Sequence, residues 1–191
     1  SYGATYLKVH VNVDPVIQLK NLTAIHTILE KNSYKLDYDL VIFPQHGFLK
    51  SQHLLEEALK LPYVSTLGGV DPASLDMDPT KVLQSTFRLA AKYNKNIDIH
   101  LHDGGTLGLW QINQIIDLTH DYNFQNKVAI SHAYCLGEFE ENELAPTLEK
   151  LSSLGICINT TVPLDSSKPP LPILDKYNVK SHIINDNIND H

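Results

Sequence analysis

Apolar residues along the chain form short extended runs that alternate with longer stretches of helical spacing. The first run, residues 5–13 (TYLKVHVNV), alternates and is rich in β-branched and aromatic residues, which predicts a strand. Asp14 and Pro15 then suit the start of a helix, because Asp caps helices and Pro fits their first turn. Apolar residues recur every three or four positions from there to about Glu30, so a helix with one apolar face is expected.

The same order of strand and helix continues to the end of the chain. Seven strands are expected, at residues 5–13, 40–43, 64–70, 97–102, 128–132, 156–161 and 182–184. Helices are predicted at residues 15–30, 53–61, 79–94, 107–122 and 144–154, and a proline-rich turn at 169–174. Strands that alternate with helices or loops at roughly thirty-residue intervals indicate repeated βα units in a parallel sheet.

Polar residues collect where these strands end, and residues 97–105 (IDIHLHDGG) form the densest group. In a (β/α)₈ barrel the strand ends converge on one mouth, where the chemistry takes place. An open doubly wound sheet has its site at one switch point and need not carry polar residues at every strand end. The pattern therefore predicts an α/β fold of the TIM (β/α)₈ type. The polar residues are His10, Asn12, Gln45, His46, Asp71, His100, His102, Asp103, His132, Thr160, Thr161 and Asp186.

The predicted barrel is incomplete, because seven strands are one fewer than closure requires. A barrel without one strand has two unpaired edges that need covering. We therefore expect a fragment, with one further strand before Ser1 and more chain after His191. A length of 191 residues with 42% hydrophobic content is enough to bury a core, so residues 1–191 are expected to form a single barrel domain in part.

The composition of the chain limits the kinds of binding partner and the cellular compartment that are expected. The net charge is −7 with interspersed charges, so no basic face is available for nucleic acid. No run approaches the roughly 20 apolar residues of a membrane helix, and the first residues lack the pattern of a signal peptide. The two cysteines, Cys135 and Cys157, have no CxxC spacing and fit a reducing cytoplasm. A cytoplasmic protein with a small neutral or cationic ligand is expected.

Five segments carry a more specific signal. They are KVHVNVD at 8–14, FPQHG at 43–47, DIHLHD at 98–103, SHAYCLG at 131–137 and NDNINDH at 185–191. In this order and at these strand ends, they resemble the cytosine deaminase branch of the amidohydrolase superfamily, from end to end of the chain. The resemblance implies strands 2 to 8 of a metal-dependent hydrolase barrel. It also implies hydrolytic deamination of a cytosine-like or pterin-like heterocyclic amine by a metal-activated water.

The resemblance also implies a set of metal ligands. In that family one divalent metal is held by a His-x-His pair on the first strand, a His on the fifth and an Asp on the eighth. His100 and Asp186 occupy the last two positions and suit zinc or iron(II). The first-strand pair has no counterpart, since His10 aligns with the second strand. The metal is therefore expected in the full-length protein, its presence in this fragment stays open, and the fragment is expected to be inactive.

The catalytic residues implied by the resemblance are Asp103, His132 and Asp186. His132 and Asp186 are expected to steer the attacking water, and Asp103 to transfer protons where the family usually has Glu. Because Asp is one methylene shorter, its reach falls by about 1.3 to 1.5 Å, which matters over hydrogen-bond distance. The alternative for Asp103 is a structural role in the following helix or glycine turn.

Two further residues are predicted to bind the substrate. Gln45 can donate and accept together, which matches a ring carbonyl and its adjacent N–H. His102 shares the face of His100 by strand alternation, and its alternative is a hydrogen bond to a loop carbonyl. An aromatic contact is expected from Trp110 or Phe48. The cysteines are predicted to be buried small hydrophobes without a base partner, and His26, His53, His120 and His182 to be surface or packing histidines.

Two other functions stay open from the sequence. The missing His-x-His pair favours a catalytically incomplete fragment or binding module, which needs a partner segment of its own chain or a second copy to cover its edges. Alternatively, the same scaffold could hydrolyse a cyclic amide, and ring opening instead of ammonia release would distinguish that reaction. Nucleic acid and membrane are not expected as partners in any of these cases.

Overall fold

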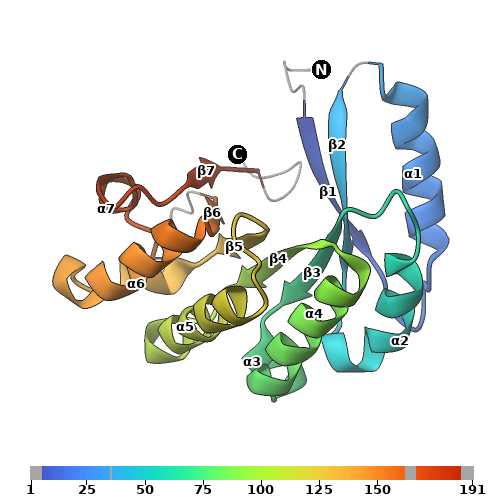
Figure 1. Ribbon diagram of the computed structural model, residues 1–191. Helices are drawn as coiled ribbons and strands as arrows, with labels where there is room; N and C mark the ends of the chain where they lie inside the picture. Colours follow the sequence, from blue (N-terminus) through green and yellow to red (C-terminus); the bar gives the residue numbers. More distant parts are fainter. Residues whose placement is uncertain (1–5, 35, 162–166, 186–191) are drawn as a thin grey trace.

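The structure is a computed structural model that describes residues 6–34, 36–161 and 167–185. It contains one parallel sheet of seven strands that lie in chain order from β1 to β7 (Figure 1). This confirms the predicted number and order of the strands. The strands are β1 Tyr6–Asn12, β2 Asp37–Phe43, β3 Thr66–Val70, β4 Asn96–Leu101, β5 Val128–His132, β6 Cys157–Thr160 and β7 Ser181–Ile183.

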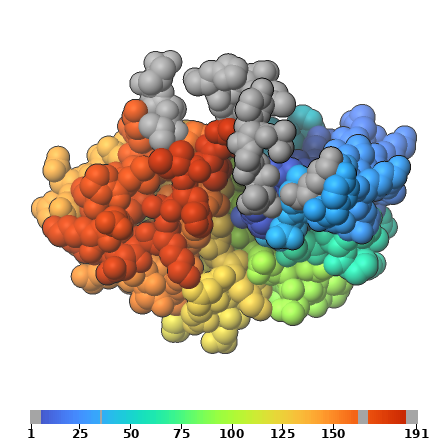
Figure 2. All heavy atoms as spheres, turned by 90° about the horizontal axis from the view of Figure 1, so that it is seen from above, coloured from blue at the N-terminus to red at the C-terminus, as the bar shows by residue number. Residues whose placement is uncertain are grey.

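Helices cover the outer face of this curved sheet (Figure 1). They are α1 Lys20–Asn32, α2 Phe48–Leu59, α3 Pro72–Asp76, α4 Pro79–Tyr93, α5 Gly105–Asp121, the 3₁₀ helix η1 Tyr134–Gly137, α6 Glu141–Leu154 and α7 Leu171–Lys176. Within the described residues, β1 pairs only with β2 and β7 only with β6, so the sheet is a half-barrel. Figure 2 shows the N-terminal part of the chain, in blue, and the C-terminal part, in orange and red, on opposite sides of the molecule. Among the described helices, none has the length and apolar character to cross a bilayer.

The core lies between the sheet and the helices, while polar side chains lie on the inner face of the sheet. In β4, Ile97, Ile99 and Leu101 are buried in the hydrophobic core with α4 and α5 residues. Asp98 and His100 alternate with them and therefore point to the inner face. The strand is buried on both faces, but only one face is apolar. This division places the chemistry inside the barrel.

Local sequence signals explain the helix that was predicted best, α4. Asp78 accepts a hydrogen bond from the amide of Lys81 at 3.1 Å, and Pro79 occupies the first turn. Asn94 ends the helix at φ 50°, in the left-handed region that Asn tolerates. The predicted start at Pro79 is confirmed, and the helix ends at Tyr93, one residue before the predicted end, with Asn94 as its cap.

The starts of α1 and α2 differ most from the prediction, while α5 begins at Gly105 instead of residue 107 and α6 at Glu141 instead of residue 144. Helix α1 begins at Lys20 instead of near Pro15. Asp14 Oδ1 accepts a hydrogen bond from Val16 N at 2.7 Å and stabilises a separate turn. Gln18, at φ 56°, then interrupts the helical backbone conformation. Helix α2 begins at Phe48, before the predicted cap Ser51, because a remote residue supplies the cap.

That remote residue is Asp76. Its carboxylate accepts from Phe48 N at 2.7 Å and from Leu49 N at 2.9 Å, and thereby satisfies the first amides of α2. Helices α3 and α7 were not predicted, and α7 replaces the expected proline-rich turn at 169–174. Both have Pro in their first turn, where the missing N–H costs nothing.

Candidate active site

The carboxyl ends of the strands surround a cavity of about 250 Å³. This is the end of a barrel where βα loops converge and where catalytic residues are placed in this class of fold. The sequence-predicted residues Gln45, His100 and His102 all line it. The complete lining is His10, Asn12, Phe43, Gln45, Val70, His100 and His102.

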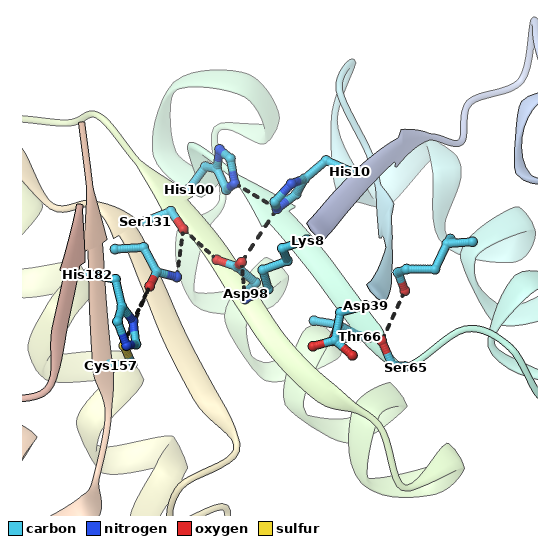
Figure 3. Close-up of polar contacts among 12 residues, drawn as sticks. Lys8, His10, Asp39, Ser65, Thr66, Asp98, His100, Ser131, Cys157 and His182 are labelled. Carbon is cyan, nitrogen blue, oxygen red and sulfur yellow. Dashed lines mark hydrogen bonds and ion pairs between the residues drawn. The ribbon is translucent and has the colours of Figure 1, made fainter. Parts of the chain in front are cut away.

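The curvature of the sheet brings His100 of β4 against His10 of β1, although β2 and β3 lie between these strands (Figure 3). Their Nε2 atoms are 3.0 Å apart. At this distance at least one of the two nitrogens must be unprotonated, since two N–H groups would repel each other. The pair therefore directs a nitrogen lone pair into the space between β1 and β4.

Beneath the two histidines lies Asp98, whose side chain is fully buried. Its Oδ1 accepts from Ser131 Oγ at 2.7 Å, and its Oδ2 is 2.6 Å from Lys8 Nζ and 3.4 Å from His10 Nε2. Burial alone would raise the pKa of Asp98, but His10 and Lys8 outweigh it and hold that pKa well below its usual range. The carboxylate is therefore charged. Donor atoms of His10, Asp98 and His100 all lie within 4.8 Å of one another, so this group could hold a metal ion.

His132 approaches His100 from β5. By register it pairs with Leu101 and would face outward, but its φ of 73° turns the chain at the strand end. Its Nε2 lies 3.1 Å from His100 Nδ1, and its Nδ1 lies 3.1 Å from Tyr134 Oη. Burial lowers the pKa of His100 to about 3, against the attraction of Asp98, so His100 is neutral at physiological pH.

A carboxylate and a histidine form a second pair at the rim of the cavity. His102 Nδ1 is 2.9 Å from Asp71 Oδ2, and the amide of His102 donates to Asp71 Oδ1 at 2.8 Å. Burial would raise the pKa of Asp71, but its hydrogen bonds to His102 lower that pKa overall. The His102 ring lies 4.2 Å from the His132 ring, centroid to centroid. The His10–His100 pair and the Asp71–His102 pair therefore belong to one site.

Asp103 is adjacent in sequence but points elsewhere. Its Oδ1 accepts from Ser74 Oγ at 2.6 Å and its Oδ2 from Gln111 Nε2 at 2.9 Å, and it does not line the cavity. Its predicted role as the acid stays a prediction. Asp186, predicted to be a ligand and to steer the water, lies outside the described residues.

The aromatic residue that lines the cavity is neither Trp110 nor Phe48. Phe48 is fully buried in the core and Trp110 does not line the cavity, whereas Phe43 lies 4.7 Å from the His100 ring, centroid to centroid. Phe43 ends β2 immediately before the predicted Gln45 segment, so its position at the mouth was available from the strand assignment.

Sequence reasoning missed Lys8, Asp98 and the pairing of Asp71 with His102. A signal existed for the first two, because charged residues inside an otherwise buried strand pattern are rarely unpaired. The prediction that Cys157 has no base partner was wrong, since its Sγ lies 3.2 Å from His182 Nδ1. This pair joins neighbouring strands, so only the register of the sheet reveals it.

Comparison with known proteins identifies similar sequences and structures. No model of a known protein family matches the sequence. N-isopropylammelide isopropyl amidohydrolase from Pseudomonas sp. strain ADP is 30% identical over 176 residues, which are 91% of this chain and 43% of that protein. The crystal structure of N-isopropylammelide isopropylaminohydrolase from Burkholderia multivorans is 32% identical with a TM-score of 0.90, over 94% of this chain and 46% of that one.

A more distant structure shares the fold. 5-Methylcytosine deaminase from Klebsiella pneumoniae, liganded with phosphonocytosine, matches with a TM-score of 0.82 at 18% identity. The match covers 95% of this chain and 48% of that chain. The chain therefore spans less than half the length of the relatives it matches, and its seven strands form an incomplete barrel of their type.

Proposed function

The chain belongs to the amidohydrolase superfamily and has the fold of its cytosine deaminase-like members, and from this we propose that the full-length protein hydrolyses an exocyclic amine from a nitrogen heterocycle. Water replaces the exocyclic C–N bond at a ring carbon by a C–O bond, and ammonia or an alkylamine is released. The observation that carries the proposal is the convergence of His10, His100 and the Asp71–His102 pair on one cavity. A cytoplasmic location stays a prediction.

The donor atoms at His100 fit a divalent cation. His100 is neutral, so its ring has one nitrogen with a free lone pair for a metal ion. Its Nε2 lies 3.0 Å from His10 Nε2. We propose that His100 holds the ion together with Asp186, as the resemblance implies, with His10 beside them. Nitrogen and carboxylate oxygen donors suit zinc or iron(II). A bound ion supplies Lewis acidity that makes water a nucleophile near neutral pH.

Hydrogen bonds to neighbouring residues determine which ring nitrogen of His100 carries the proton. With Nε2 of His100 used as a ligand atom, its proton lies on Nδ1 and is donated to Nε2 of His132, 3.1 Å away. His132 then carries its own proton on Nδ1 and donates it to Tyr134 Oη, which donates to Thr161 Oγ1 at 2.8 Å. This chain of donors orients both imidazoles.

His102 is the proposed proton carrier. Asp71 accepts from its Nδ1, so Nε2 is the basic nitrogen of the ring, and the carboxylate stabilises the imidazolium that forms when Nε2 takes a proton. From the rim of the cavity, this nitrogen can deliver a proton to a ring nitrogen and then to the leaving amine. Asp103 is the alternative acid from the family pattern, but its two oxygens are held by Ser74 and Gln111.

The cavity favours a small flat ring. Gln45 and Asn12 supply amide groups at its edge, and Phe43 supplies an apolar wall. The names of the two similar enzymes, which act on N-isopropylammelide, favour an alkylated or free exocyclic amine over a cyclic amide bond. Cytosine, aminopterins and N-alkylamino triazines are therefore the proposed substrate panel.

The test is amine release from this panel by full-length protein, with metal content measured on the same samples. His102→Gln should lower kcat about 10²- to 10⁴-fold, the range of general acid–base catalysis. His53→Gln, an exposed histidine on α2, is the matched control and should retain activity. Turnover by His102→Gln equal to wild type would contradict the assignment, and ring opening without amine release would support the cyclic amide alternative.

A further inference from the structure

A group of side chains on the inner face of β6 and β7 lies apart from the candidate active site. Cys157 begins β6 and His182 lies within β7, so both are near the amino ends of their strands (Figure 3). Cys157 Sγ is 3.2 Å from His182 Nδ1, and Asn159 Oδ1 is 3.5 Å from that sulfur and 3.2 Å from that nitrogen. One sulfur, one nitrogen and one oxygen therefore form a compact triangle.

The triangle has nearly the dimensions of three ligands on one tetrahedral cation. Zinc bonds of about 2.3 Å to sulfur and about 2.0 to 2.2 Å to nitrogen and oxygen place such ligand atoms about 3.4 to 3.6 Å apart. The observed edges of 3.2, 3.2 and 3.5 Å are close to these separations. Only a small outward shift of the three atoms would be needed.

Hydrogen bonding also orients the amide toward this position. Asn159 Nδ2 lies 3.5 Å from Ser131 Oγ, which in turn donates to Asp98 at 2.7 Å, so Asn159 Oδ1 is left facing the Cys157–His182 pair. Asn159 Oδ1 can accept from both partners, because the Cys157 thiol donates to it at 3.5 Å and His182 Nδ1 lies 3.2 Å from it.

The three ligand side chains share one cavity. Cys157, Asn159 and His182 line a cavity of about 930 Å³ on the inner face of the sheet. Two cations are nearby, but Lys8 is paired with Asp98 at 2.6 Å, and Lys180 Nζ donates to Asn126 Oδ1 at 3.1 Å. Burial raises the pKa of the Cys157 thiol, so a bound cation has to displace its proton to solvent.

We propose that Cys157, His182 and Asn159 form a second metal site, which binds a thiophilic divalent cation such as Zn²⁺ or Cd²⁺. The thiol gives up its proton on binding, His182 binds in its neutral form, and water completes the coordination. The ion links β6 to β7, a three-residue strand at the end of the sheet. The site is independent of the proposed deamination, because none of its ligands lines the candidate active site.

The probe is Cd²⁺, titrated into the metal-free full-length protein while thiolate-to-cadmium charge-transfer absorption is recorded in the ultraviolet. The wild-type chain should show a saturable band. Cys157→Ser should lose the band, and His182→Gln should weaken cadmium binding at least about tenfold, as expected for the loss of a metal-site contact. Circular dichroism confirms that each variant is folded. His182 is exposed, so His182→Gln keeps the test valid if Cys157→Ser does not fold.

The controls separate this site from others. His120→Gln, at an exposed histidine on α5, should bind as wild type. Cys135 remains in every variant, so a band that persists in Cys157→Ser would come from Cys135 or another thiol and overturn the proposal. Binding that is unchanged in His182→Gln, or no band in wild type, would also overturn it. Cadmium bound at His10 and His100 gives no thiolate absorption band. The cadmium result can therefore be interpreted even if the proposed deamination is not observed.

Discussion

Replacing Lys8 by Met should destabilise the chain more than replacing Asp98 by Asn, although both substitutions break the same ion pair. Lys8 Nζ and Asp98 Oδ2 are 2.6 Å apart, but the two side chains differ in exposure: 27% for Lys8 and 0% for Asp98. Removal of Lys8 leaves a carboxylate with no access to water. Removal of the Asp98 charge leaves an ammonium group that can turn toward solvent.

The exposures set the expected magnitudes. A buried charge that loses its partner costs about 3 to 5 kcal/mol, and Lys8→Met should fall in this range, at its lower end because Ser131 and His10 still contact Asp98. Asp98→Asn removes a charged hydrogen bond without burying an unpaired charge, which costs about 1.5 to 3 kcal/mol. Lys8→Met should therefore cost more than Asp98→Asn by up to about 1.5 kcal/mol.

The assay is urea denaturation followed by far-ultraviolet circular dichroism, on both single variants, the Lys8→Met/Asp98→Asn double variant and an Asp117→Asn control. Asp117 is exposed on α5, so its substitution should change stability by less than about 0.5 kcal/mol. The double variant should cost less than the sum of the singles, because neither charge is left alone.

Acidification provides a second readout with a definite sign. In wild type the pKa of Asp98 is lowered, so its charge stabilises the fold above the pKa of an unfolded Asp, about 3.9, and this contribution fades as pH falls. Without Lys8 the pKa should rise, and lower pH should recover part of the loss. An Asp98→Asn cost equal to or above that of Lys8→Met would refute the reasoning.

Three other variants test separate parts of the structure. Asp103→Asn in full-length protein should change kcat less than tenfold, far below the effect of His102→Gln, and steady-state kinetics would contradict this if the order were reversed. Gly68→Ala should cost about 1 to 3 kcal/mol in urea denaturation, because its Cβ would lie 2.7 Å from Ile42 O. Asp76→Ala should lower stability by about 0.5 to 2 kcal/mol through loss of the α2 cap, and an unchanged unfolding midpoint would exclude that role.

The strands were predictable because each carries its own signal. Residues 97–102 alternate apolar with polar, and the same short-range pattern fixes both the strand and the face on which His100 lies. Helix α4 was equally accessible, since its cap Asp78 and its end Asn94 flank it directly. Helix α2 was not, because its cap Asp76 lies 28 residues from Phe48, and no local pattern encodes such a contact.

The site was predictable only where strand ends determine it. Gln45, His100 and His102 were placed at the mouth by their positions after apolar runs, and all three line the cavity. The orientation of Asp103 depends instead on side chains of α3 and α5, which local sequence does not place. The Cys157–His182 pair required the register of β6 with β7, which only the assembled sheet provides.

The central claim, that His100 organises a metal-dependent site for amine hydrolysis, is tested most directly on the full-length protein. Metal content and amine release should be measured together for wild type, His100→Gln and the exposed control His53→Gln. We predict that wild type and His53→Gln bind a divalent metal and release ammonia or alkylamine from the heterocycle panel, and that His100→Gln loses both. Turnover in His100→Gln at the wild-type rate would contradict the account.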